Sequence, residues 1–452
     1  MVDADMMDTE PNTAPCPGSV YDAFATAVLA HDRAVVDRLK AVLDLNPDSS
    51  RAWAAKAILT VMLARSELLP AAREAAATAR RCRDCNGDDA AYVKAAEVLV
   101  IGNWSGAVSV LERLLERSPN DSLAAKLSHG LQFMLGDATG MLHSISMVMN
   151  RLEPDHPHAG FLFGCQAFAL EENHRFAEAE RIGRVALERT PQDAWGMHAV
   201  SHVYEMTGRA ATGIAWIDAH PEAVWNCNNF RFHLFWHKAL FLLDVGDVTG
   251  ALECYDHFVR AERTDDFRDI ANATSFLKRI ELLGKSAGSR WEELADICVR
   301  RIEDRTLVFA DLHYGMALAG AGRVEPALAL AKSLQTLPAQ SEPQTVLAKR
   351  VGARAAGAII DHARGRYSQA AEKLHSVQPH LQLLGGSNAQ RDIFEQIMLD
   401  AMVRSNHPEA PARLASRLAR RHGNNAFASA LLSRHGRAGH QIKPRITRGV
   451  LA

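Results

Sequence analysis

Residues 194–211 read AWGMHAVSHVYEMTGRAA, and this stretch decides the expected fold. It contains a small residue, Ser201, then an aromatic residue, Tyr204, then a turn glycine, Gly208, and finally Ala211. A small residue midway along a helix lets a second helix approach closely, and glycine commonly ends a helix. The stretch therefore predicts one helix–turn–helix unit that packs through small residues.

Turn signals of this kind recur along the chain at a nearly constant spacing. Five of them, from Gly102 to Gly246, follow one another at intervals of 34, 38, 34 and 38 residues. A period near 34 residues is that of the tetratricopeptide repeat. We therefore expect an all-α protein, a right-handed α-solenoid of degenerate tetratricopeptide-like helix–turn–helix repeats. Turn signals at this period predict about 19 helices between Val20 and Arg434.

The composition changes only at the two ends of the chain. Residues 1–18 hold three prolines and several acidic residues without apolar periodicity, which predicts a disordered acidic leader. Residues 19–436 form the expected solenoid, with a histidine-rich groove within residues 160–320. Residues 437–452 are a basic tail containing Lys443, Arg445 and Arg448, and we interpret it as solvated.

Charge and hydropathy exclude several kinds of partner. The formal net charge is -2, so no overall field favours nucleic acid. The N-terminus lacks the basic residues and apolar core of a signal peptide, and no apolar stretch has the length of a membrane span. The seven cysteines are odd in number and scattered, which is typical of free thiols in a reducing compartment. These features predict a cytoplasmic protein without a membrane or nucleic-acid partner.

Two histidine pairs with helical spacing lie in neighbouring units. His198 and His202 form the first pair, and His233 and His237 form the second. Residues four apart on a helix project from one face, and Glu205 continues the first stripe. In the register of the repeat, these positions face the concave groove. The pattern therefore predicts a cluster of imidazoles and carboxylates in that groove.

The same register brings further residues to the expected site. Glu171 and His313 fall at groove positions of other units, and Asp311 is expected to orient His313. Because His313 lies about three units beyond His198, it joins the cluster only if the superhelix bends back on itself. The candidate catalytic residues are His198, His202, Glu205, His233, His237, Asp311 and His313. The candidate substrate-binding residues are Glu171, Trp195, Trp236 and Asn229.

The residue types in this cluster suit two kinds of chemistry. Neutral imidazoles with carboxylates bind Zn, Mn, Fe and similar ions, so His198, His202, His233 and His237 are candidate ligands of a divalent metal. The same groups serve metal-free acid–base catalysis, because histidine titrates near neutral pH. The HExxH motif of zinc proteases has a Glu directly after its first histidine, and the first pair here lacks it. The pair therefore does not predict protease chemistry.

Two functions remain open on the sequence. The leading interpretation is an enzyme that acts on a small-molecule substrate, a hydrolase or a lyase, with metal-assisted or histidine-based acid–base chemistry. The alternative is a tetratricopeptide scaffold that binds an extended peptide or a partner protein in its groove. An enzyme predicts a closed pocket, whereas a scaffold predicts an open trough through several units. A histidine site also predicts ligand binding that changes steeply between roughly pH 5 and 8.

Several segments resemble the tetratricopeptide repeat protein 38 family. The resemblance covers residues 155–320 well and rests on residues 167–172, 193–206, 236–240, 250–256, 290–291 and 309–313. It implies a repeat fold and marks the seven candidate catalytic residues as positions of the family pattern. The chain departs from that pattern at Leu234, Phe235 and Lys238, and the resemblance implies no settled reaction.

Overall fold

The computed structural model describes residues 17–83, 85, 87–336 and 342–437, and within them the secondary structure is helical apart from one isolated bridge between Asp32 and Cys227. The α-helices are α1 Pro17–Leu29, α2 Val35–Leu45, α3 Ser50–Val61, α4 Leu69–Arg81, α5 Gly87–Val100, α6 Trp104–Arg117, α7 Ser122–Leu135, α8 Ala138–Met149, α9 Ala159–Glu172, α10 Phe176–Arg189, α11 Ala194–Met206, α12 Ala210–Asp218, α13 Pro221–Trp225, α14 Phe230–Asp244, α15 Val248–Cys254, α16 Phe267–Leu282, α17 Arg290–Val299, α18 Val308–Gly320, α19 Val324–Thr336, α20 Glu342–Leu347, α21 Ala353–Ala363, α22 Tyr367–Val377, α23 Asn388–Arg404, α24 Ala410–Arg420 and α25 Ala426–Arg437. Four short 3-10 or π segments accompany them: η1 Ser66–Leu68, η2 Tyr255–Val259, η3 Ala348–Gly352 and η4 Gln378–Leu384.

Local sequence explains the limits of α11, the helix that carries the first histidine pair. Asp193 precedes it, and its side chain accepts a hydrogen bond from the backbone N–H of Trp195 at 3.2 Å. This cap satisfies a donor that has no partner within the helix. After Thr207 the chain turns at Gly208, where φ is 70°, a conformation that glycine adopts at low cost. The helix is therefore fixed at both ends by its own sequence.

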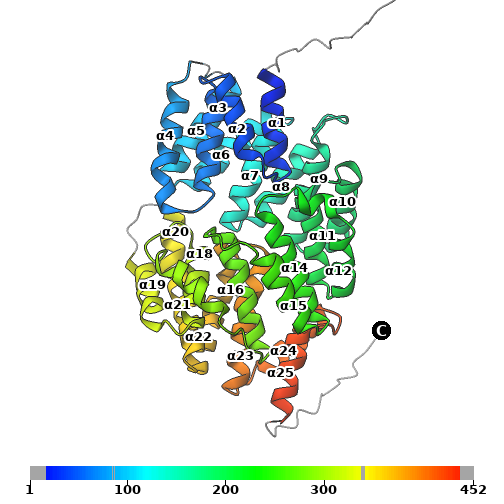
Figure 1. Ribbon diagram of the computed structural model, residues 1–452, viewed down its shortest axis with the longest axis vertical. Coiled ribbons are helices and arrows are strands. Elements are labelled where there is room, and N and C mark those ends of the chain that lie inside the picture. The colour runs from blue at the N-terminus through cyan, green and yellow to red at the C-terminus, as the bar shows by residue number, and fades with distance from the viewer. Residues whose placement is uncertain (1–16, 84, 86, 337–341, 438–452) are drawn as a thin grey trace, which may run out of the picture.

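Consecutive helices pack against each other and also against the second helix along the chain. Thus α3 contacts α4 and α5, and α9 contacts α10 and α11. Figure 1 shows the chain passing from the N-terminal helices at the top, through α9–α12 on the right, to α19–α22 at the lower left. The central helices α11, α14, α16 and α18 are buried along most of their length, so the core of the molecule runs through them.

Contacts between distant segments close this array on itself. Arg65, between α3 and α4, pairs with Asp265 at 2.8 Å, and Glu67 pairs with Arg301 at 2.6 Å. On another side of the molecule, Glu172 at the end of α9 accepts a hydrogen bond from the backbone of Asn388 at 2.7 Å. These contacts link residues more than 190 positions apart, and they enclose the central helices between the two halves of the chain.

The structure departs from the sequence-based expectation at the ends and in the number of helices. Helix α1 begins at Pro17, so the last two residues of the expected leader are helical, while residues 1–16 lie outside the described residues. Helix α25 ends at Arg437, and residues 438–452 of the expected tail also lie outside them. The expectation of about 19 helices was too low because short helices such as α13 interrupt the assumed period.

Within the described residues, no helix is both long enough and apolar enough to cross a bilayer.

Candidate functional site

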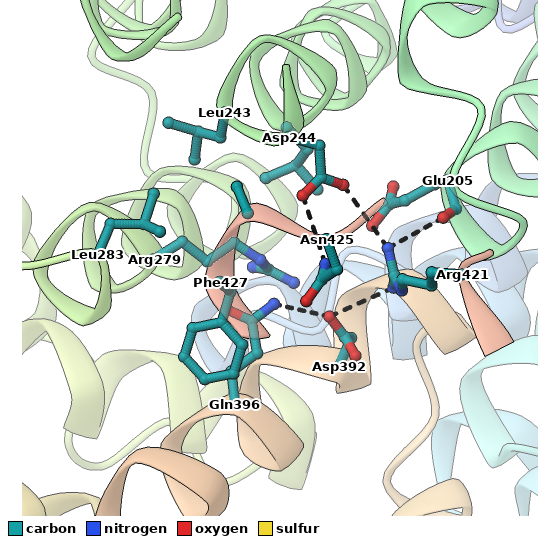
Figure 2. Close-up of a pocket in the computed structure, with 12 residues that line it drawn as sticks. Glu205, Leu243, Asp244, Arg279, Leu283, Asp392, Gln396, Arg421, Asn425 and Phe427 are labelled. Atoms are coloured by element: carbon teal, nitrogen blue, oxygen red, sulfur yellow. Dashed lines mark hydrogen bonds and ion pairs between the residues drawn. The ribbon is translucent and has the colours of Figure 1, made fainter. Parts of the chain in front are cut away.

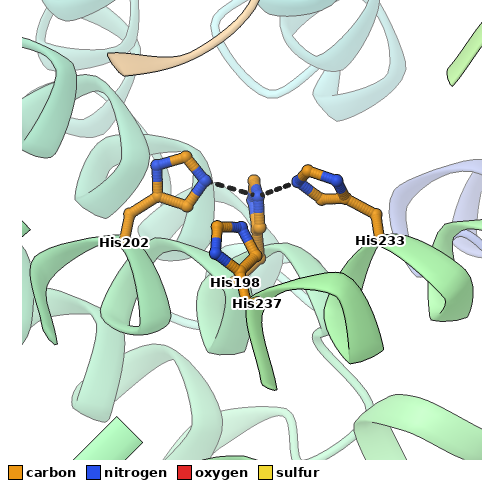
Figure 3. A group of neighbouring side chains, drawn as sticks. All are labelled: His198, His202, His233 and His237. Atoms are coloured by element: carbon orange, nitrogen blue, oxygen red, sulfur yellow. Dashed lines mark hydrogen bonds between the residues drawn. The ribbon is translucent and has the colours of Figure 1, made fainter. Parts of the chain in front are cut away.

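Four histidine side chains from two adjacent helices meet at one point in the interior. His198 and His202 come from α11, and His233 and His237 come from α14. The Nε2 atom of His198 lies 2.8 Å from Nε2 of His202 and 2.8 Å from Nε2 of His233. The ring of His237 completes the group, with its centre 4.5 Å from that of His202 (Figure 3). One ring nitrogen from each histidine lies within 4.8 Å of the other three.

The outward-facing nitrogens of the α14 pair are held by hydrogen-bond acceptors. Nδ1 of His233 lies 2.9 Å from Oδ1 of Asn272, and Nδ1 of His237 lies 2.8 Å from Oε2 of Glu205. A carboxylate or amide oxygen can only accept, so each Nδ1 carries the hydrogen. The Nε2 atom of each ring then carries a lone pair that faces the shared point.

The α11 pair is not oriented in this way. Nδ1 of His202 lies 3.3 Å from Oε2 of Glu171, but neither atom has a hydrogen-bond partner. Nδ1 of His198 is also buried without a hydrogen-bond partner. Two of the four imidazoles, those of His233 and His237, are therefore oriented by an acceptor behind them.

The centre of the cluster is only partly satisfied. Nε2 of His198 lies 2.8 Å from Nε2 of both His202 and His233, and it has at most one hydrogen to donate to them. Nε2 of His237 is buried and has no hydrogen-bond partner. A cation at the shared point would satisfy the remaining lone pairs.

The imidazoles of the cluster are uncharged at neutral pH. All four side chains are buried, and burial is the largest cause that lowers their pKa values. Burial lowers the pKa of His202 to about 4, and it lowers the pKa values of the other three well below the ordinary range. Neutral imidazole is the form that binds metals.

The two carboxyl groups behind the histidines respond to burial in the opposite direction. Burial raises the pKa of Glu171 to about 8 and also raises the pKa of Glu205. A divalent cation among the imidazoles would stabilise the ionised form of both groups. Glu205 meets the cluster through His237, and one carboxylate oxygen each of Glu171 and Glu172 lies close to His202. The expected roles, Glu205 in catalysis and Glu171 in substrate binding, stay predictions.

Aromatic side chains form the walls of the cluster. The ring of Trp236 stacks on His233, with ring centres 5.1 Å apart, and the ring of Trp195 lies 4.9 Å from that of His198. Phe168 also stacks on His198, with ring centres 5.3 Å apart, and it lies beside Trp195 at 4.6 Å. Both tryptophans are buried, at 8% exposure or less, so the structure places them as packing around the imidazoles.

Three predicted site residues do not join the four histidines. Nδ1 of His313 lies 2.8 Å from the carbonyl oxygen of Phe309 in its own helix, α18, and its ring packs against Phe394. Asp311 is two positions away on that helix, so it points to another side and does not orient His313. Asn229 donates to Asp269 at 3.2 Å at the start of α14. The structure therefore does not place these three side chains in the group of four histidines, and the roles expected for them stay predictions.

The structure also adds residues that sequence analysis missed. Asn272 on α16 orients His233, and no spacing rule marks a single asparagine within a helix. Glu172 lies beside Glu171, and both have a carboxylate oxygen near His202. His31, in the turn after α1, stacks on Trp195 with ring centres 5.4 Å apart. His31 is far from the four histidines in sequence, so no sequence pattern connected it with them.

Comparison with known proteins gives one finding. A scan against protein-family models matched none of them to this chain.

Proposed function

We propose that the protein is a metal-dependent enzyme, a hydrolase or a lyase, that acts on a small-molecule substrate. The observation that carries the proposal is the convergence of four imidazole nitrogens on one point, with two of the rings oriented from behind by Asn272 and Glu205. Metal-binding histidines usually donate their second ring nitrogen to such an acceptor. An all-nitrogen ligand set suits Zn, Cu, Fe and Ni better than Mg or Ca.

The four histidines would hold an ion through one ring nitrogen each, and two pairs of these nitrogens lie 2.8 Å apart. A bound ion would supply Lewis-acid activation of water or of a carbonyl group.

The chain's own residues keep the site ready for such chemistry. Glu205 and Asn272 hold the hydrogens of His237 and His233 on Nδ1, which keeps both Nε2 atoms free. Trp236 and Phe168 surround the imidazoles with apolar surface and exclude bulk water. In such surroundings, electrostatic interactions with a substrate are stronger than in water.

We further propose that the helices form a right-handed α-solenoid of tetratricopeptide-like repeats related to the tetratricopeptide repeat protein 38 family. The contacts of α3, α7 and α9 with their next two neighbours along the chain support this proposal. The peptide-scaffold alternative has less support, because the four histidines are at most 6% exposed. An extended peptide would need an open trough at that point.

Elemental analysis of the purified full-length protein tests the metal site. We expect about one Zn, Fe, Cu or Ni ion for each chain, removable by a strong chelator and restored by adding back the ion. Protein that holds no such ion, and takes up none after incubation with each of the four, would contradict the proposal.

A substrate panel tests the enzymatic part. Esters, lactones, amides and substrates of β-elimination are offered to the metal-loaded and the chelated protein. We expect turnover of one class that disappears on chelation and returns with the ion. A protein that binds metal but shows equal turnover in both forms would have a structural metal site instead.

Acid sensitivity provides a separate prediction for the bound metal. Protons compete with a metal only below the pKa that the imidazole has in the folded protein. Because burial lowers the pKa of His202 to about 4, competition begins near that pH and not near 6.5, where an exposed histidine titrates. We therefore expect the metal to remain bound at about pH 5.5 and to be released near pH 4, as measured by dialysis and elemental analysis. Release that is complete at about pH 6 would show that the imidazoles titrate as exposed groups.

A further inference from the structure

A small polar cavity lies beside the histidine cluster, where α11, α14, α16 and α23 meet the segment around α25. It has a volume of about 30 Å³. Its lining includes Glu205, which also holds His237 (Figure 2). The side chain of Asp244 at this cavity is 16% exposed, so the lining reaches the surface. Since about 10–15 Å³ is enough for one water, the space fits the two oxygens of a carboxylate group.

Arg279 of α16 points into this cavity without an acidic partner. Its guanidinium donates to the carbonyl oxygens of Ser275 at 3.2 Å and Ala389 at 2.9 Å, and it lies 5.4 Å from the ring centre of Trp236. Among the described residues, no carboxylate lies within ion-pair distance of it, and Figure 2 shows it apart from the linked side chains. A buried guanidinium, 5% exposed, normally requires a negative partner.

The acidic groups around the cavity are already engaged elsewhere. Asp392 accepts two hydrogen bonds from Arg417, at 2.6 and 2.7 Å. Glu205 accepts from His237, and Asp244 lies 3.7 Å from Arg421. The guanidinium of Arg421 donates to the carbonyl oxygen of Glu205 at 2.9 Å, and it lies 3.6 Å from Asp392 and 3.7 Å from Asp244, so both of its ion pairs are long.

We propose that this cavity binds the carboxylate group of a small-molecule ligand through Arg279 and Arg421. Planar guanidinium groups match a carboxylate with paired hydrogen bonds. Three carboxyl groups also line the cavity, so a singly charged carboxylate fits better than a doubly charged phosphate. The inference deepens the proposed function by naming carboxylate-bearing molecules as the substrate class. It rests on that function only for the link to catalysis, because the cavity itself requires no metal.

Acetate binding to the full-length protein tests this proposal. Acetate is titrated into the protein as purified and into the same protein after chelation, with chloride and phosphate at matched ionic strength as comparison ions. The readouts are the thermal unfolding midpoint and the NMR line width of acetate. We expect saturable binding of acetate in both forms and weaker binding of phosphate. Acetate binding by a chain that holds no metal would support this site while contradicting the metal centre.

Three variants locate the binding site. Arg279→Gln should weaken acetate binding at least about tenfold, because it removes a charged hydrogen-bond donor. Arg420→Gln is the matched control on the neighbouring surface, where this side chain is 56% exposed, and it should change nothing. Asp244→Asn removes a like charge from the lining and should tighten binding at least about threefold. A misfolded variant cannot produce tighter binding.

The proposal is overturned by any of three results. These are acetate that stabilises no more than chloride, phosphate that binds more tightly than acetate, or Asp244→Asn that leaves acetate affinity unchanged or weaker.

Discussion

Replacing His202 and His237 together by glutamine is expected to weaken metal binding at least about 10,000-fold, or about 5.5 kcal/mol. Each of these side chains offers one of the four nitrogens at the shared point, and His237 is also held from behind by Glu205. Structural zinc sites contribute about 10–16 kcal/mol of apparent binding energy, so losing half of the ligands is expected to remove about a third to a half of it. Glutamine keeps much of the side-chain volume, which limits the cavity left in the core.

Thermal unfolding in the presence and absence of a chelator measures this effect. Chelation should lower the unfolding midpoint of the wild type, because a ligand bound only to the folded state stabilises it. The double variant should unfold at a midpoint that the chelator does not change. His143→Gln with His257→Gln is the matched control, because both side chains are exposed and lie outside the cluster. A double variant that stays as chelator-sensitive as the wild type would exclude the histidine cluster as the metal site.

Sequence periodicity was sufficient to predict that His198, His202, His233 and His237 meet. The spacing of four within each pair fixes the face of the helix, and the repeat period fixes the relation of His198 and His202 to His233 and His237. Both rules are local, acting within one helix or between two neighbouring helices. The structure brings these four together, and it brings Glu171 and Glu205 behind them by the same local geometry.

Contacts between distant segments could not be predicted in this way. His313 had the correct register, but the path of the chain over about three units decided its place, and small angular differences between units accumulate over that length. The burial of the cluster likewise depends on closure of the array, for example through Glu172 and Asn388, which are 216 residues apart. No periodic signal connects such residues. Arg279 and its cavity escaped notice because a single arginine in a helix usually faces solvent.

Gly208→Ala is expected to destabilise the protein by about 3 kcal/mol, and this prediction tests the closure of the array. Gly208 is the turn residue after α11, with φ at 70°. A Cβ atom there would lie 2.4 Å from the carbonyl oxygen of Arg421, which belongs to the segment after α24. The clash involves backbone on both sides, so neither partner can relieve it by changing a rotamer. The two segments would have to separate at the point where Arg421 donates to the carbonyl of Glu205.

Gly322→Ala separates this packing effect from backbone strain. Gly322 also ends a helix, α18, with φ at 72°, but a Cβ atom there has nothing within 4 Å. It should cost only about 1 kcal/mol, the usual penalty for alanine in the left-handed region. Denaturant unfolding measures the loss in free energy of unfolding for each variant. We expect the two losses to differ by about 2 kcal/mol, and this difference is the contribution of the close approach between α11 and the segment after α24. Equal losses in the two variants would show that the turn after α11 does not pack against Arg421, and that the chain does not close around the histidine cluster in this way.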